Sequence, residues 1–208
     1  MIMEDKKLTA QESLEIITSM ISRTKERYFG NGNILLLWGF LTVAVTIAVW
    51  ILLLTTQKAI WNLLWIALPV IGLPLSAIIG KKQTIKDGVR TYSDRIISKL
   101  WMITGMSYII MVIACIIFKS VGICCWSTFL PFTLMVVPIS IVAQGLIVKE
   151  GSMIGGGFIA LIIGIFTLCC VAADIPLGVN WFLPLFIIAF IVMMVIPGFV
   201  LNYKIKHQ

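Results

Sequence analysis

The sequence predicts an all-α integral membrane protein, and three observations support this fold class: the composition, the long apolar runs and the distribution of charge. Hydrophobic residues make up 60% of the 208 positions and charged residues 12%, and the mean hydropathy is +1.07. Water-soluble domains average about 45–50% apolar and about 25% charged residues. One core could not bury this much apolar surface, so part of the chain is expected to face lipid.

Six apolar runs are long enough to cross the hydrocarbon core of a bilayer, which takes about 20 helical residues. Short connections between most of them predict three antiparallel hairpins, whereas residues 81–99 form a longer polar connection, called here the middle loop. Together the runs make one transmembrane domain, residues 34–202, followed by a cytoplasmic tail, residues 203–208. The predicted spans are residues 34–54, 61–80, 100–118, 126–148, 153–173 and 181–202.

Residues 1–33 are predicted to form an amphipathic helix and a hinge before the first span. Thr9 and Glu12 have the spacing of a capping box, apolar residues recur at helical spacing over residues 9–29, and Gly30 is a helix stop. This helix is expected to lie on the inner membrane surface, to dock under the bundle or to bind a cytosolic partner. The amino terminus lacks the pattern of a cleavable signal peptide, so the first span is expected to act as the insertion signal.

The positive charges predict the orientation of the bundle. Of the 16 Lys and Arg residues, only Lys58 and Lys119 fall on the side opposite the two termini. Because cytoplasmic loops carry the excess of Lys and Arg, both termini are expected in the cytoplasm. The net charge of +7 then reflects orientation and attraction to anionic lipid. No basic segment alternates with exposed aromatic residues, so a nucleic-acid partner is not expected.

Asp, Glu, Lys, Arg and His are missing from all six apolar runs. Within a membrane such residues mark proton relays and ion-coupling sites, so neither an ion-coupled transporter nor an intramembrane enzyme is expected. The one histidine, His207, lies in the tail. We therefore expect no catalytic residue, no cofactor and no metal site. Polar span residues are expected to form hydrogen bonds between helices. For Gln144, the most polar of them, an orientation toward an internal cavity is the less favoured alternative.

Small residues in the fifth run predict close helix packing. Gly151 with Gly155, and Ala160 with Gly164, have the four-residue spacing that lets two helices approach each other. The triplet of residues 155–157 also resembles a phosphate-binding loop, but it lacks the Gly-Lys-Ser/Thr ending of such loops. Close packing or a flexible helix entry is the favoured interpretation.

Four prolines deep in the spans are candidate hinge or packing positions: Pro69, Pro74, Pro138 and Pro197. A proline removes one backbone hydrogen bond and bends its helix. In lipid this is tolerated where neighbouring groups satisfy the freed carbonyl. A mobile hinge and a static packing kink are both compatible with the pattern.

Five cysteines map to the outer half of the predicted bundle. A structural disulfide could join Cys124 or Cys125 to Cys169 or Cys170 in an oxidising compartment. The alternatives are ordinary apolar packing and thiol chemistry, although the Cys-x-x-Cys spacing of redox enzymes does not occur.

Charged residues on the cytoplasmic side are candidates for partner binding. Arg23 and Arg27 lie in the amphipathic helix, and Arg90, Asp94 and Arg95 lie in the middle loop. The Asp87-Gly88 pair predicts a turn in this loop, and Thr91 with Asp94 has the spacing that opens a short helix. A solvated, positively charged connector is the alternative interpretation of the same loop.

Three stretches carry a resemblance to a known group of proteins: "ESLEIITSMISRTKERYFGNGNILLLWGFLTV" (12–43), "WNLLWIALPVIGLP" (61–74) and "VMMVIPGFVLNYK" (192–204). They resemble uncharacterised six-span inner-membrane proteins of Bacteroidetes. The resemblance extends over nearly the whole chain and implies a location in the bacterial cytoplasmic membrane. It implies no activity and no site residues.

Three functional classes follow from these observations. The favoured one is a non-catalytic inner-membrane protein that binds another membrane or cytosolic protein through its cytoplasmic helix and middle loop. The alternative is a permease-like membrane subunit of an ABC-type exporter, whose layout is similar. A membrane enzyme is the least favoured, and a homo-oligomer is compatible with each class.

Overall fold

The computed structural model describes residues 9, 11, 14, 15, 18, 32–87 and 92–206. Within this part of the chain helices are joined by short turns and connections, no strand occurs, and six helices are long and apolar enough to cross a membrane. The prediction of an all-helical chain with six apolar spans is confirmed. The amphipathic helix predicted over residues 9–29 lies largely outside the described residues. The six helices are Gly32–Thr56, Ala59–Lys82, Tyr92–Ser120, Trp126–Val148, Gly151–Ala172 and Val179–Lys204.

Several of the spans are composite. The second opens with a 3₁₀ segment before a regular helix, and the sixth contains a π-helical turn between two α-helical parts. In chain order the elements are α2 (Gly32–Thr56), η1 (Ala59–Ile66), α3 (Ala67–Asp87), α4 (Tyr92–Ser120), η2 (Trp126–Thr128), α5 (Phe129–Val148), α6 (Gly151–Ala172), α7 (Val179–Phe190), η3 (Ile191–Val195) and α8 (Ile196–Lys206).

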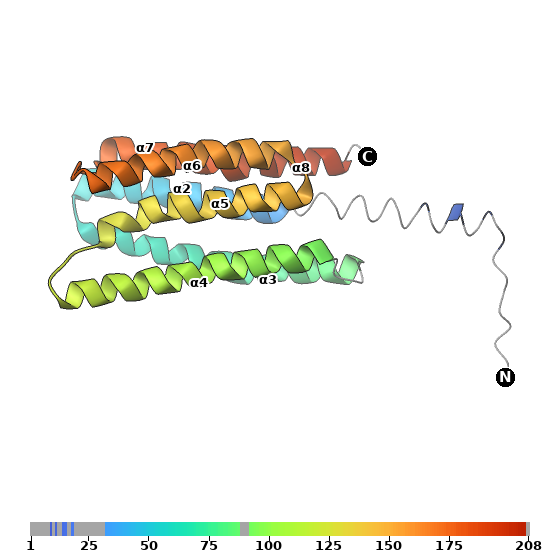
Figure 1. Cartoon of the computed structure of the whole chain (residues 1–208), viewed down its shortest axis with the longest axis horizontal. Helices are drawn as coiled ribbons and strands as arrows, with labels where there is room; N and C mark the ends of the chain where they lie inside the picture. The colour runs from blue at the N-terminus through green and yellow to red at the C-terminus, as the bar shows by residue number, and fades with distance from the viewer. Residues whose placement is uncertain are drawn as a thin grey trace.

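The helices run side by side and alternate in direction (Figure 1). The start of α2, the turn between α5 and α6 and the end of α8 lie at one end of the bundle, called here the terminal end. The connections that follow α2, α4 and α6 lie at the opposite, distal end.

The core is formed by α2, α5, α6 and the sixth span, and the most extensive packing joins α5 to α6. Leu134, Ile141, Met153, Phe186 and Met193 are among its fully buried side chains. The helix α3 packs on α2, and α4 packs on α5. Only 6% of the apolar stretch in the second span and 11% of that in the third are buried, against 56% in the fourth. The second and third spans are therefore peripheral.

A tight turn explains why α5 and α6 pair so closely. Lys149 adopts a left-handed conformation with φ of 57°, which ends α5, and the N–H of Glu150 donates to the carbonyl of Gly145 over 2.9 Å. The carboxylate of Glu150 then caps α6 by accepting from the N–H of Ser152. With two residues between the helices, α6 returns directly along α5.

Candidate functional site

A buried carboxylate lies at the terminal end of the bundle. The Glu150 side chain accepts hydrogen bonds from Lys204 Nζ, 2.8 Å from Oε2 and 3.1 Å from Oε1. Ser152 Oγ donates to Oε1 over 3.0 Å. Glu150 as a residue is 2% exposed, whereas the Lys204 side chain is 44% exposed. This Glu150 cluster (Glu150, Ser152 and Lys204) ties the α5–α6 turn to the end of the sixth span.

The ionised form of Glu150 is the stable one. Burial alone would raise the pKa of this carboxyl group, but the hydrogen bonds from Lys204 and Ser152 and the charge of Lys204 outweigh burial and lower the pKa below its ordinary value. Removing one partner of a buried ion pair is strongly destabilising because a bare charge stays behind. With its carboxylate oxygens hydrogen-bonded to Lys204 and Ser152, Glu150 has a structural role: it holds the α5–α6 turn against the end of the sixth span.

The sequence reasoning missed Glu150. It lies in a short connection outside the apolar runs, so the search for charges within spans passed over it. A usable signal was present: an acidic residue directly before Gly151 and two residues before Ser152 has the position of a helix N-cap. The partner Lys204 is 54 residues away and could not be assigned from the sequence.

Polar side chains inside the spans form hydrogen bonds between helices, as predicted. Gln144 is 7% exposed and accepts from the indole N–H of Trp101, so it joins α4 to α5 instead of facing a cavity. Other bonds tie α4 to α5, α2 to α3 and the start of α2 to α8. They are Thr104–Ser140 at 2.6 Å, Trp38–Ser76 at 2.9 Å and Asn202–Asn33 at 2.7 Å, and the Trp101–Gln144 bond is 2.8 Å long.

Two of the candidate prolines are packing positions. Pro138 and Pro197 are less than 2% exposed. Near each proline, one backbone carbonyl has no helical N–H donor, and a glycine of α6 packs against that carbonyl. Pro138 has no N–H to give to the carbonyl of Leu134, and a Cβ placed on Gly164 would collide with that carbonyl oxygen. Glycine permits this close approach, in which a Cα–H faces the oxygen.

The π-helical turn before Pro197 produces the same arrangement. The N–H of Ile196 donates to the carbonyl of Ile191, five residues back, and Pro197 has no N–H. The carbonyl of Val192 therefore lacks a helical donor. The N–H four residues ahead, that of Ile196, goes to Ile191, and the residue five ahead, Pro197, has no N–H. The Val192 oxygen faces Gly156, where a Cβ would collide with it. Both buried prolines therefore act with glycines of α6.

The small residues of α6 that pack against other helices include one of the two predicted pairs, Ala160 and Gly164, but not the other, Gly151 and Gly155. Gly156, Ala160 and Gly164 are buried at four-residue intervals. A Cβ placed on Gly151 or Gly155, the first predicted pair, would meet no atom of another described element within 4 Å. Hydrophobicity alone could not distinguish the two faces, because α6 is apolar all round.

The other two candidate prolines lie in the peripheral second span. Pro69 and Pro74 are not buried in the bundle core, so neither faces an internal cavity. Pro69 follows the eight-residue 3₁₀ segment η1, which is long for this helix type. Because Pro69 has no N–H, it cannot donate the α-helical hydrogen bond to the carbonyl of Trp65. The residues just before it form the tighter 3₁₀ helix instead.

All five cysteines carry free thiols in the structure. Cys124 and Cys169 are exposed, and Cys115 and Cys170 are buried. The buried Cys115 Sγ lies 3.9 Å from the carbonyl oxygen of Cys125, which it can approach as a weak donor. A disulfide between the predicted cysteine pairs stays a prediction for an oxidising compartment.

The predicted partner-binding residues are only partly described. Asp94 and Arg95 lie in the first turn of α4 and are exposed, and an acidic residue there stabilises the helix dipole. Arg23, Arg27 and Arg90 lie outside the described residues. The Glu150 cluster draws its cation from Lys204 and not from Arg95, so the structure does not combine these two groups into one site.

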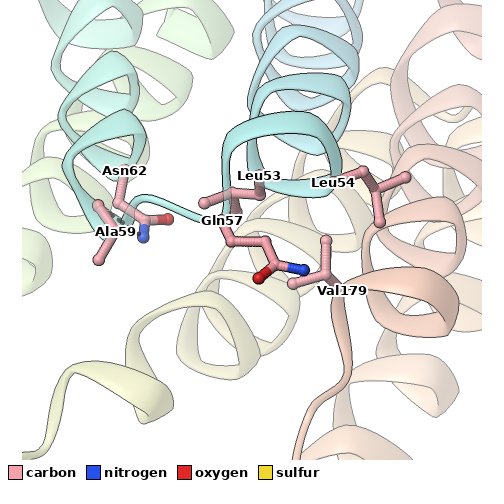
Figure 2. A pocket seen from close by; sticks show the side chains of 6 residues that line it. All are labelled: Leu53, Leu54, Gln57, Ala59, Asn62 and Val179. Carbon is pink, nitrogen blue, oxygen red and sulfur yellow. Dashed lines mark hydrogen bonds between the residues drawn. The ribbon is translucent and has the colours of Figure 1, made fainter.

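A pocket of about 430 Å³ opens at the distal end. It is formed by the end of α2, the start of η1 and the start of α7 (Figure 2). One turn before the pocket in α2, the indole N–H of Trp50 is shielded from solvent and has no acceptor among the described residues. An unsatisfied buried donor costs about 1–3 kcal/mol.

The chemical inventory of the described residues is limited. They contain no group of three or more His, Cys, Asp or Glu side chains that could hold a metal ion. In comparisons with protein-family models, curated proteins and solved structures, nothing matches this chain. The functional argument therefore rests on the packing, charges and surfaces of the chain itself.

Proposed function

We propose that this protein is a non-catalytic, multi-pass subunit of the bacterial inner membrane that binds a partner protein through α3, α4 and the middle loop between them. The supporting observation is the uneven packing of the bundle. The second and third spans bury 6% and 11% of their apolar stretches, whereas the first, fourth, fifth and sixth bury 28–56%. The least buried spans are also the two that flank the predicted charged loop.

The exposed face of α4 suits helix–helix association within lipid. Met102, Ile109 and Ile116 lie on this face and are 57–62% exposed. On the same side of the helix, a Cβ placed on Gly105 would meet no atom of another described element within 4 Å. In a bilayer, association depends on close van der Waals packing, because lipid tails are as apolar as leucine. A ridged apolar surface with an open glycine offers such packing to a second membrane protein.

Basic side chains continue this face at the terminal end. Lys81 and Lys82 near the end of α3, and Arg95 and Lys99 in the first turns of α4, are exposed. A partner with acidic residues close to the membrane would complement them. The predicted amphipathic helix, with Arg23 and Arg27, supplies the second contact in this proposal.

The proposal keeps the arrangement as three antiparallel hairpins. Contacts of α2 with α3, of α4 with α5 and of α6 with the sixth span support it, and the α5–α6 turn joins the last two hairpins. The second and third spans then form the outer edge, where a partner has access. A permease-like exporter subunit is the alternative, and it requires the partner to be an ATPase.

Site-specific photo-cross-linking in native membranes tests the proposal. We would place the cross-linking residue at Ile110 of α4, and at Ile162 of α6 as a control, because these side chains are 65% and 66% exposed. We expect one protein adduct from Ile110 and from Arg95, of the same identity, and none from Ile162. Lipid adducts alone at Ile110, or equal protein capture at Ile162, would refute the proposal. An ATPase recovered from Arg95 would support the exporter alternative.

A further inference from the structure

The distal pocket has walls contributed by three segments. Leu53, Leu54 and Gln57 come from the end of α2, Ala59 and Asn62 from η1, and Val179 from the start of α7. Figure 2 shows the Gln57 side chain extending between the leucines of α2 and Val179, with Asn62 on the neighbouring η1 helix. Four apolar residues and two carboxamides therefore surround one opening.

The local backbone keeps this pocket open. Gln57 has a left-handed backbone conformation, with φ of 52°, and its N–H donates to the carbonyl of Leu53 over 3.0 Å. The helix α2 ends at this turn, next to the pocket. The indole N–H of Trp61 donates to Thr56 Oγ1 over 2.6 Å and holds the start of η1 against α2. The turn is thus fixed by side-chain and backbone bonds, and the pocket lies beside it.

Hydrogen-bond donors occur at two depths. At the rim, Lys58 is exposed between the pocket residues Gln57 and Ala59. Deeper, Trp50 precedes Leu53 and Leu54 by three and four residues, so it lies on the same face of α2, about 5 Å further along the helix axis. Its N–H lacks an acceptor among the described residues. Because the Trp50 N–H is shielded from solvent and Trp50 does not line the pocket, Lys58 is the charged donor that a ligand can reach. A ligand that fits therefore carries an anionic group at the rim and an apolar part against the leucines.

The level of the pocket is that of a membrane interface. Trp61 and Trp181 lie beside the pocket residues Asn62 and Val179 in sequence, and tryptophan is concentrated where headgroups meet acyl chains. The described charged residues of the distal connections are Lys58, Lys119 and Asp174. Of these, Lys58 is the one within the pocket-forming segment.

We propose that this pocket binds an anionic phospholipid of the leaflet at the distal end. The headgroup phosphate lies at Lys58 and the Gln57 carboxamide, and the upper acyl chain packs on Leu53, Leu54 and Val179. This site is independent of the partner-binding face proposed for α3 and α4.

Native mass spectrometry of the full-length protein in detergent tests the site, with added dioleoylphosphatidylglycerol or dioleoylphosphatidylcholine as probes. We expect the wild type to prefer phosphatidylglycerol, and Lys58→Gln to reduce this preference about fivefold, the factor that corresponds to one lysine at a membrane surface. Lys119→Gln is the matched control, because it removes a lysine of the distal end outside the pocket, and it should leave the preference unchanged.

Two further variants test which side chains the lipid contacts. Trp50→Phe removes a shielded donor that does not line the pocket, and it should leave the binding of both lipids unchanged. Val179→Trp should fill the pocket and abolish the binding of both. Inorganic phosphate should not compete, because it has no acyl chain, and competition at millimolar concentration would identify an anion site instead of a lipid site. Equal effects of Lys58→Gln and Lys119→Gln, or unchanged lipid binding by Val179→Trp, would overturn the proposal.

Discussion

Gly156→Ala tests the close contact between α6 and the π-helical turn. The added Cβ would collide with the carbonyl oxygen of Val192 and lie 3.1 Å from its carbonyl carbon and 3.2 Å from Met193 Cα. All three atoms belong to the backbone, so no side-chain rotation relieves the contact. Overpacking of this kind costs about 1–3 kcal/mol. The same substitution also gains about 1 kcal/mol of helix propensity, which partly hides the cost.

The neighbouring Gly155→Ala is the matched control. Gly155 lies in the same helix, but a Cβ placed there would meet no atom of another described element within 4 Å, so this variant changes helix propensity alone. We expect Gly156→Ala to be about 1–3 kcal/mol less stable than Gly155→Ala. The measurement is reversible unfolding in mixed micelles with increasing sodium dodecyl sulfate, followed by circular dichroism. Equal stability of the two variants would refute the proposed role of glycine at this contact.

Three further predictions concern polar and thiol groups. Because the folded-state pKa of Glu150 lies below its ordinary value, its ion pair should stabilise the protein fully above about pH 4.3 and progressively less as the pH falls towards the folded-state pKa; the melting-temperature difference between wild type and Glu150→Gln should therefore shrink on acidification, and a constant difference would contradict this. A double-mutant cycle with Thr104→Val and Ser140→Ala should give a coupling energy of about 0.6 kcal/mol, and zero coupling would show that this bond contributes nothing. Maleimide labelling of the folded protein, counted by mass spectrometry of peptides, should modify Cys124 and Cys169 before the buried Cys115 and Cys170; the reverse order would disagree with the described packing.

The number of helices that are long and apolar enough to cross a membrane could be predicted, because it depends on local properties of the chain. A run of about 20 apolar residues is readable without knowledge of its neighbours. For the same reason the role of Gln144 in helix–helix hydrogen bonding was predictable, since a carboxamide in lipid needs a partner. Its particular partner, Trp101, depends on how α4 and α5 rotate against each other, which no local pattern records.

The π-helical turn and the choice of glycines on α6 could not be predicted. Every face of α6 is apolar, so the hydrophobic pattern carries no information on which glycines pack. The buried set at Gly156, Ala160 and Gly164 is selected by carbonyl groups of other helices. Likewise, Glu150 becomes a buried ion only because Lys204 returns to the same end of the bundle. These features depend on tertiary geometry. Of the four prolines named from the sequence, Pro138 and Pro197 are buried, and whether either one moves as a hinge stays a prediction.

The pairing of proline-freed carbonyls with glycines bears on how the chain enters the bilayer. If α5 passed into hydrocarbon alone, the carbonyl of Leu134 would meet lipid with neither a helical donor nor the Cα–H of Gly164, and a bare backbone oxygen is costly there. The two-residue turn at Lys149 and Glu150 keeps α6 within immediate reach of α5. We therefore expect α5 and α6 to leave the insertion machinery as one preassembled unit, and biogenesis of this protein to be limited by the arrival of α6.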